Sequence, residues 1–356
     1  MEHTDSSIRS VSRVAASIIV VVVIVAAVVS IFIVLPNLTK STTGQKASFM
    51  LDFSPQCFHA LFYYGYDHGF YTDNGLNVTI MPGSGSLNTI AAVATGKVDF
   101  GWADTGTLAQ EAMTSNISNV RIVAMVYHVT PFVLLYNNAT IHSFSDLNGK
   151  TLGSNQGSGS LVLFRILAKN YGLNMSSIQI KYASPSVYPE LVVTGQVDFI
   201  ATTIDKVPLL TPLAEKQGIS LNFFRYADYG LDIYGNAIIT TTQMIQNQPN
   251  LVKSFVNATM YGIVGAAHNP LDAVHSLVKY QTQLNYSSCL LPYEYTVNNT
   301  IPNVNSSTYL SQPLTLGWIN STKLQQTIDI VAEGYNVSSP IAASSLFTDQ
   351  FVQNPT

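Results

Sequence analysis

Two similar stretches of the chain most constrain how it can fold. They read AVATGKVDFGWADTGTLAQ at 92–110 and LVVTGQVDFIATTIDKVPLL at 191–210. Each looks like the end of a helix, a Thr-Gly turn and a short apolar strand that opens on Val-Asp-Phe, followed by an acid, Asp104 or Asp205. A helix that ends in glycine and leads directly into a buried strand is half of an α/β crossover. The alternative is that Gly-x-Val-Asp is only common punctuation between a helix and a strand.

Two such units predict two similar lobes, each an open sheet with helices on its faces. Residues 49–127 read as β-α-β-α-β-α-β, and residues 151–201 repeat this order. A strand at 132–136 is expected to cross to the second lobe, and residues 223–234 are expected to return. The chain after residue 247 reads as mainly helical and is expected to pack on the first lobe, with a surface insertion at 283–312.

The N-terminal region predicts a membrane anchor. Residues 14–35 are apolar and carry no charge, and about 20 such residues span a bilayer. The apolar region of a signal peptide has roughly 7–15 residues, so we expect an uncleaved anchor. Arg9 and Arg13 precede the run and place the N-terminus inside the cell. We therefore expect a cytoplasmic tail at 1–13, the transmembrane helix at 14–35, a linker at 36–48 and an extracellular domain beyond, in a single-pass protein of the cell membrane.

Composition supports an extracellular location. Charged residues make up 10% of the chain and the net charge is −4, which excludes a typical nucleic-acid-binding face. Few lysines and glutamates among many Asn, Ser and Thr resemble cell-surface proteins of archaea. Glycosylation acceptors occur at eleven asparagines, which suggests a glycoprotein; they are Asn37, Asn77, Asn116, Asn138, Asn174, Asn257, Asn285, Asn298, Asn305, Asn320 and Asn336.

The chain has two cysteines, Cys57 and Cys289. They permit at most one intramolecular disulfide, which an oxidising exterior would allow. The sequence does not show whether the two residues meet.

Several further stretches carry a family resemblance. They are LDFSPQCFHALFYYGYDHGFY at 51–71, TGKVDFGWAD at 95–104, DLNGKTLG at 146–153, FRYADYGLDIYGNAIITT at 224–241, LVKSFVNATMYGIVGAAHNPLDAV at 251–274, LQQTIDIVAEG at 324–334 and LFTDQF at 346–351. In their order and spacing the chain resembles the solute-binding proteins of ABC importers, which have the two-lobed periplasmic-binding-protein type 2 fold. More narrowly, it resembles the branch that binds thiamine pyrimidine precursors, alkanesulfonates, taurine and nitrate.

This resemblance implies an α/β fold with lobe 1 at 49–130 plus 236–351 and lobe 2 at 131–235. It also implies a small polar or anionic solute bound between the lobes, and an ABC permease with its ATPase as partners. The pyrimidine-precursor binders usually have Trp and Asn where this chain has Phe53 and Gln56.

Three loops between a strand end and a helix start are expected to meet in the cleft. Backbone N–H groups and the positive ends of helices favour an anionic or strongly polar ligand group at such loops. The alternative is that the loops only cap helices. Their candidate binding residues are Ser54, Gln56, Ser84, Gly85, Ser86, Gly157, Ser158, Gly159 and Ser160.

Other candidates supply side-chain chemistry. His59 could hydrogen-bond a ligand or simply pack in the core, and Phe53, Phe58, Trp102 and Tyr188 could stack on a flat ligand. The two acids of the repeated motif could accept hydrogen bonds from an amine, or could cap the helices that follow. The remaining candidates of this kind are Asp104, Thr105, Asp205 and Tyr234.

No catalytic motif is recognisable in the sequence. HExxH, G-x-S-x-G, a Walker loop and a metal-spaced Cys/His set are missing, so we expect neither an enzyme nor a cofactor. The predicted mechanism is closure of the two lobes about a hinge near 130–136 and 228–235. A sensory ectodomain is the main alternative, disfavoured by the short N-terminal tail. An enzyme that makes the thiamine pyrimidine would need an iron-binding Cys cluster.

Overall fold

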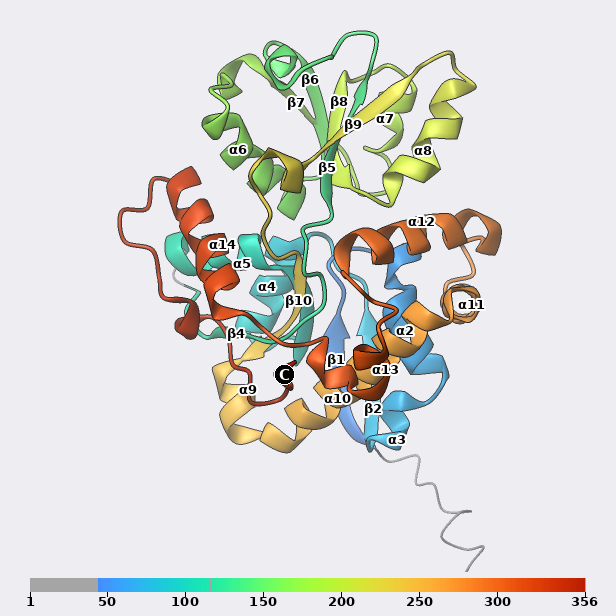
Figure 1. Ribbon diagram of the computed structural model, residues 1–356, viewed down its shortest axis with the longest axis vertical. Coiled ribbons are helices and arrows are strands. Elements are labelled where there is room, and N and C mark those ends of the chain that lie inside the picture. The colour runs from blue at the N-terminus through green and yellow to red at the C-terminus, as the bar shows by residue number, and fades with distance from the viewer. Residues whose placement is uncertain (1–43, 116, 356) are drawn as a thin grey trace, which may run out of the picture. The chain divides into compact units, whose positions relative to one another are not determined.

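The computed structural model describes residues 44–115 and 117–355, which form an α/β fold with two five-stranded sheets (Figure 1). The predicted tail, anchor and most of the linker lie outside the described residues. In the part that is described, no helix combines the length and the apolar character needed to cross a membrane.

The first sheet has the strand order β2-β1-β3-β10-β4. β1 pairs in parallel with β2 and β3, whereas β10 runs antiparallel between β3 and β4. Alternation of buried and exposed residues at the start of β2 fits a strand with one face on the core. The strands are β1 (Gln45–Met50), β2 (Leu76–Met81), β3 (Phe100–Asp104), β4 (Val120–Met125) and β10 (Asn236–Thr241).

The second sheet has the order β7-β6-β8-β5-β9 and an equivalent arrangement. Here β6 pairs in parallel with β7 and β8, and β5 runs antiparallel between β8 and β9. We call the part of the chain built on the first sheet lobe 1 and the part built on the second lobe 2. The strands are β5 (Phe132–Asn137), β6 (Thr151–Ser154), β7 (Gln179–Tyr182), β8 (Phe199–Thr203) and β9 (Leu221–Arg225).

Helices cover both sheets (Figure 1). In lobe 1, α10 and α11 pack on α2, and α4 packs on β3 and β10. The lobe 1 helices are η1 (Cys57–His59), α2 (Ala60–Asp67), α3 (Phe70–Asp73), α4 (Ser86–Ala94), α5 (Thr105–Thr114), α9 (Thr242–Asn247), α10 (Pro249–His268), α11 (Pro270–Tyr280), α12 (Tyr286–Thr300), α13 (Ser307–Ser311), η5 (Pro313–Thr315), α14 (Ser321–Gly334) and η6 (Ala343–Ser345). Those of lobe 2 are η2 (Phe144–Leu147), α6 (Gly159–Asn170), η3 (Met175–Ser177), α7 (Glu190–Val193), α8 (Lys206–Glu215) and η4 (Tyr226–Tyr229).

The repeated sequence motif has the same structural role in each lobe. Gly96 and Gly195 adopt positive φ angles of 71° and 67° just after α4 and α7, where glycine avoids the strain of a side chain. The aspartate of each Val-Asp-Phe then accepts a bond from the backbone of the neighbouring parallel strand. Asp99 Oδ2 accepts from Ser48 N at 2.7 Å, and Asp198 Oδ2 accepts from Thr151 N at 2.8 Å. The motif therefore fastens one parallel strand to the next.

Two element boundaries differ from the sequence prediction. β1 begins at Gln45, so residues 45–48, assigned to the linker, instead pair with β2. Residues 221–225, in part assigned to the return crossing, form β9 and pair with β5. In both cases backbone pairing with a distant strand decides the boundary, and local sequence does not contain that information.

The predicted surface insertion also differs from expectation, because it is ordered helix with a buried face. α12 buries Cys289, Tyr293 and Val297 in the core of lobe 1, and it packs both on η1 of lobe 1 and on α8 of lobe 2 (Figure 1). Cys289 is bonded to Cys57 at the start of η1, 232 residues away in sequence. The disulfide thus fixes α12 to the helix that follows the first strand.

We expect that replacing both cysteines by serine lowers the free energy of unfolding by roughly 2–5 kcal/mol, because the cross-link restricts a long loop of the unfolded chain. Denaturant titration of the full-length chain would measure this. Reductant should lower the stability of the wild type to that of Cys57→Ser/Cys289→Ser and leave the double variant unchanged; equal stabilities under oxidising conditions would contradict the prediction.

Candidate functional site

The carboxyl ends of β1 and β3 bring several polar side chains to one edge of the lobe 1 sheet. Asp52 follows β1, and Asp104 is the last residue of β3. Because β10 runs antiparallel to β3, its first residue, Asn236, pairs with Asp104 at this same edge. Asn236 Nδ2 donates to Asp52 Oδ2 at 2.9 Å. This is the edge at which open α/β sheets bind ligands.

His59 belongs to the support of this edge. Gln56 N donates to His59 Nδ1 at 2.9 Å, which leaves the ring proton on Nε2 to donate to Asp52 Oδ1, also at 2.9 Å. The ring is completely buried. Both of its nitrogens are therefore used within the protein, and His59 orients Asp52 rather than offering a free nitrogen to a ligand.

Asp104 has one carboxylate oxygen that accepts hydrogen bonds within lobe 1 and one without a described partner. Its Oδ1 accepts from Thr107 N at 2.7 Å and Thr107 Oγ1 at 2.8 Å, which caps α5. Its Oδ2 is buried and has no hydrogen-bond partner among the described residues, and the same holds for Trp102 Nε1 and Tyr127 OH. The Trp102 and Tyr127 rings pack edge to face with centroids 5.0 Å apart. Buried polar atoms are rarely left unpaired, so these three indicate a ligand or bound water.

Lobe 2 contributes a second aspartate, Asp205, of which only one carboxylate oxygen is hydrogen-bonded to a described residue. Asp205 Oδ2 accepts from Lys206 Nζ at 2.9 Å, while its buried Oδ1 has no partner within the described chain. Asp205 does not cap α8 through its side chain. Lys206 Nζ also donates to Gln56 Oε1 of lobe 1, so one side chain bridges the two lobes. A third acceptor without a described partner, Asn155 Oδ1, lies in the loop between β6 and α6.

The two lobes touch through glycines at this site. A Cβ added to Gly85 would lie 2.8 Å from the carbonyl oxygen of Gly157, and one added to Gly159 would lie 3.1 Å from Asp104 Cβ. Gly85 also has a φ of 126°, which residues with a side chain rarely adopt. The two Gly/Ser loops therefore meet across the cleft, and glycine is needed for this contact.

Burial controls the electrostatics of the site. It raises the pKa of Asp104 to about 7 against the bonds from Thr107, and the nearby charge of Asp52 adds to the rise. Burial also raises the pKa of Tyr127 and of Tyr188, and for both tyrosines Asp52 and Asp205 contribute further. One acid from each lobe is thus close enough to act on the same two phenols, so the site combines charges from both lobes.

Several predicted site residues have side-chain hydroxyl groups that are hydrogen-bonded within the protein. Ser86 Oγ accepts from Asp104 N, Ser158 Oγ caps α6, and Ser160 Oγ donates to Ala201 O. Tyr188 OH is paired with Thr202 Oγ1 at 3.0 Å. Ser84 Oγ is bonded by Asn88 Nδ2. The hydroxyls of the two Gly/Ser loops therefore mostly support the loops.

Thr105 and Tyr234 also serve the fold. Thr105 Oγ1 donates to Tyr234 O, which ties α5 to the return crossing between the lobes. The Tyr234 hydroxyl accepts from Asn320 N, at the start of α14. The Tyr234 phenol thus points to α14, not toward Asp52 and Asp205.

The first Gly/Ser loop offers less to an anion than predicted. Gly83 N donates to Phe53 O at 3.1 Å, and Gly85 N donates to Asp52 O at 2.6 Å. Two of its N–H groups are therefore used to hold the loop against β1.

Five site residues were missed in the sequence. Asp52 and Lys206 each stand beside a predicted residue in a quoted motif, so a search for charged groups at strand ends could have found them. Tyr127, Asn155 and Asn236 carry no local signal, since antiparallel pairing and unpaired atoms appear only in three dimensions.

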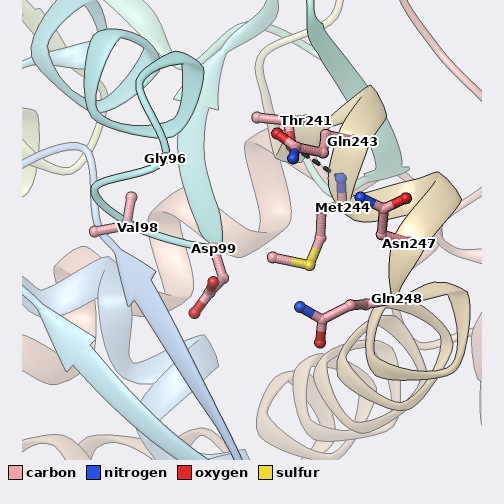
Figure 2. A pocket seen from close by; sticks show the side chains of 8 residues that line it. All are labelled: Gly96, Val98, Asp99, Thr241, Gln243, Met244, Asn247 and Gln248. Atoms are coloured by element: carbon pink, nitrogen blue, oxygen red, sulfur yellow. Dashed lines mark hydrogen bonds between the residues drawn. The ribbon is translucent and has the colours of Figure 1, made fainter.

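A different pocket lies at the opposite end of β3, as Figure 2 shows. Its volume is about 190 Å³, and its lining includes Asp99, Gln243 and Gln248. Asp99 Oδ2 is already bonded by the Ser48 backbone and hydroxyl groups. No candidate site residue lines this pocket, so we place the functional site at the cleft.

A sequence profile described as NMT1/THI5-like matches residues 56–273, more than half of the chain. The chain belongs to the NMT1/THI5-like family. The matched range runs from η1 into α11 and includes most of the cleft residues of both lobes. The sequence resemblance to this branch of two-lobed binding proteins is thereby confirmed.

Two of the named relatives of this NMT1/THI5-like chain are binding proteins, and a third is named a putative thiamine biosynthesis protein. This third relative, of Haemophilus influenzae, is 25% identical over an alignment that covers 61% of this chain and 66% of the relative. The chain is 22% identical over 320 residues to the riboflavin-binding protein RibY of Chloroflexus aurantiacus, covering 87% of each chain. It is 19% identical to the formylaminopyrimidine-binding protein of Halalkalibacterium halodurans, covering 67% of this chain and 71% of the relative. In structure it is similar to the alkanesulfonate-binding protein SsuA of Xanthomonas axonopodis pv. citri bound to MOPS, with a TM-score of 0.62, 16% identity, and coverage of 86% and 100%. These likenesses confirm the predicted two-lobed periplasmic-binding fold.

Asp104→Asn should remove a pH dependence of stability. The folded protein holds the Asp104 proton more tightly than the unfolded chain, because the pKa rises from 3.8 to about 7. The wild type should therefore lose stability relative to the variant between pH 4 and pH 7, by on the order of 4 kcal/mol. Asparagine keeps the oxygen that caps α5. Denaturant titrations of both full-length chains across this range would measure the difference.

Asp146→Asn provides a control of opposite sign. Bonds from the backbone of His142 and Ser143 lower the pKa of Asp146, so its charge favours folding at neutral pH and this benefit is lost as the pH falls below about 4. As the pH rises, wild type should gain stability relative to Asp146→Asn, whereas it should lose stability relative to Asp104→Asn. If the difference between wild type and Asp104→Asn does not change with pH at all, Asp104 is not the buried acid described.

Proposed function

We propose that this chain is the membrane-anchored, extracellular solute-binding receptor of an ABC importer, and that its solute is a small heterocycle bearing amino groups, of the pyrimidine-precursor class. The two lobes close on the solute and present it to a permease, whose ATPase supplies the energy. The chain itself binds without chemical turnover and needs no cofactor.

The observation that carries this proposal is the set of buried acceptors without partners. Asp104 Oδ2, Asp205 Oδ1 and Asn155 Oδ1 all accept hydrogen bonds and none has a described partner. A ligand with several N–H groups would satisfy them, and a buried acceptor left unpaired costs about 1–3 kcal/mol. Trp102 and Tyr127 add flat rings with unpaired polar atoms beside them, which suits a planar ring that also has acceptor atoms.

The same atoms argue against a sulfonate, taurine or nitrate ligand. An anion would face the carboxylate oxygens of Asp104 and Asp205 in a buried setting, where like charges repel strongly, and a sulfonate or nitrate has no proton to donate to Asn155 Oδ1. The cation at this site, Lys206, is already paired with Asp205. The likeness to SsuA supports the fold of this chain and not its ligand.

Two features support the extracellular location. The disulfide between Cys57 and Cys289 is typical of an oxidising compartment. Nine of the predicted glycosylation acceptors fall on described residues, and the side chains of these nine are exposed or only partly buried. Together with the apolar run at 14–35, they favour an anchored domain outside the cell.

Hydroxymethylpyrimidine and formylaminopyrimidine should stabilise the full-length chain, and taurine, methanesulfonate and nitrate should not. A ligand present at 100 times its dissociation constant raises the free energy of unfolding by about 2.7 kcal/mol. Thermal unfolding in a mild detergent would measure this, and riboflavin should be included because of the RibY relative. Stabilisation by a sulfonate and by no aminopyrimidine would contradict the proposal.

Asp205→Asn is the matched variant for this experiment. It removes a carboxylate and introduces an amide with donors, so the affinity for the aminopyrimidine should fall about ten-fold or more. Asp228→Asn, at an exposed acid of the same lobe, should leave it unchanged. Isothermal titration calorimetry would give both dissociation constants.

Gly85→Ala tests whether closure of the lobes is required. The added methyl would collide with the Gly157 carbonyl, so the lobes should stay apart and the solute affinity should fall by about ten-fold or more. Gly96→Ala is the control, since Gly96 also has a positive φ but has open space around it. Small-angle X-ray scattering with solute should show a larger radius of gyration for Gly85→Ala alone. Equal radii and affinities would argue against the hinge.

A further inference from the structure

A second cavity lies at the mouth of the cleft, outside the buried acceptors. Its volume is about 420 Å³, within the range of small-molecule sites. Lobe 1 contributes Pro55 and Leu284 to its walls, and lobe 2 contributes Pro185, Pro189 and Leu209. The walls are thus largely apolar, unlike the inner site.

Two residues connect the outer cavity to the inner acceptors through hydrogen bonds. Gln56 and Lys206 line the outer cavity, and the bond between them spans the lobes. Lys206 is bonded on its other side to Asp205, whose second oxygen is one of the unpartnered inner acceptors. The contact between Gln56 and Lys206 therefore lies between the outer cavity and Asp205, and a solute that reaches both would have to displace it.

A disulfide and helix packing fix the wall of the outer cavity. Leu284 precedes α12, and α12 is joined through Cys289 to Cys57, next to Gln56. α12 also packs on α8, which carries Leu209. The segments before η1 and before α12 thus form the cavity together with lobe 2, so its walls depend on contact between the lobes.

We propose that the solute has two parts: a compact head with N–H donors, held by the inner acceptors, and an uncharged, mostly apolar substituent that extends past Gln56 and Lys206 into the outer cavity. This rests on the proposed function, because the inner head is the aminopyrimidine. An anionic substituent is disfavoured because Lys206 is already paired with Asp205 and Glu190 also lines the cavity. Three prolines and three leucines in the lining favour an apolar, uncharged substituent.

Two probes with the same head test this inference: hydroxymethylpyrimidine and its benzyl ether. Titration calorimetry on the full-length chain should show that the benzyl ether binds about ten-fold more tightly, as expected for burying an apolar ring. Equal or weaker binding of the benzyl ether, with binding of the compact probe intact, would overturn the outer subsite and leave the proposed function standing. If neither probe binds, both proposals fail.

Leu209→Glu places a charge in the outer wall and should abolish the gain of the benzyl ether while leaving the compact probe within about two-fold. Leu284→Glu does the same from lobe 1 and guards against a folding defect in one variant. Leu213→Glu is the matched control on α8, because Leu213 is 42% exposed and does not line the cavity. If Leu213→Glu reduces the gain as much as Leu209→Glu does, the effect is not local to the cavity and the subsite is wrong.

Discussion

Carboxylate oxygens buried without partners are the constraint on which this site depends. Asp104 ends β3 and Asp205 lies two residues after the corresponding strand β8. Each aspartate uses one oxygen inside its own lobe and leaves the other unpaired. Burial of such an oxygen disfavours folding. The fold carries this cost at two equivalent places, at a cleft that both lobes line, and a solute that donates hydrogen bonds would relieve it.

The corresponding acids differ in ways that matter for binding. Asp104 caps α5 and has a pKa raised to about 7, so its charge depends on pH in the physiological range. Asp205 is paired with Lys206, which compensates its charge without filling its second oxygen. A solute therefore contacts one carboxyl group, Asp104, whose charge changes with pH, and another, Asp205, whose charge is compensated by Lys206. This pair suits an amino group or a protonated ring nitrogen better than a strong anion.

Much of the fold could be predicted from the sequence because the signals are local. The turns at Gly96 and Gly195 and the apolar strands after them gave two sheets, and the structure explains the repeated Val-Asp-Phe through equivalent bonds of Asp99 and Asp198. The start of β1 and the position of β9 could not be predicted, because pairing with distant strands sets them. The buried face of α12 was also missed, since the stretch at 283–312 that contains it has several asparagines and no lysine or arginine and so resembles an exposed segment.

The site was predicted only in part, for a related reason. Loops at strand ends were identified from their glycines and serines, but which polar atoms stay unpaired depends on hydrogen bonds made across the fold. His59 illustrates this, since both of its nitrogens are taken up by Gln56 and Asp52. Asn236 illustrates the opposite case: an unremarkable residue at the start of β10 fixes Asp52 because an antiparallel strand is inserted beside β3.

The insertion around α12 links the cleft to the rest of lobe 1. In this structure α12 contacts lobe 2 through α8, while its disulfide anchors it beside Gln56. Opening the lobes must therefore break the contacts between α12 and α8, but α12 stays attached to η1. The contact between α12 and α8 stabilises the closed arrangement of the lobes even without a solute. The solute therefore needs to supply only the rest of the free energy that favours the closed state over the open one. A two-lobed binding protein gains affinity from such a preformed contact, provided that the free acceptors of Asp104 and Asp205 keep the empty closed state unfavourable.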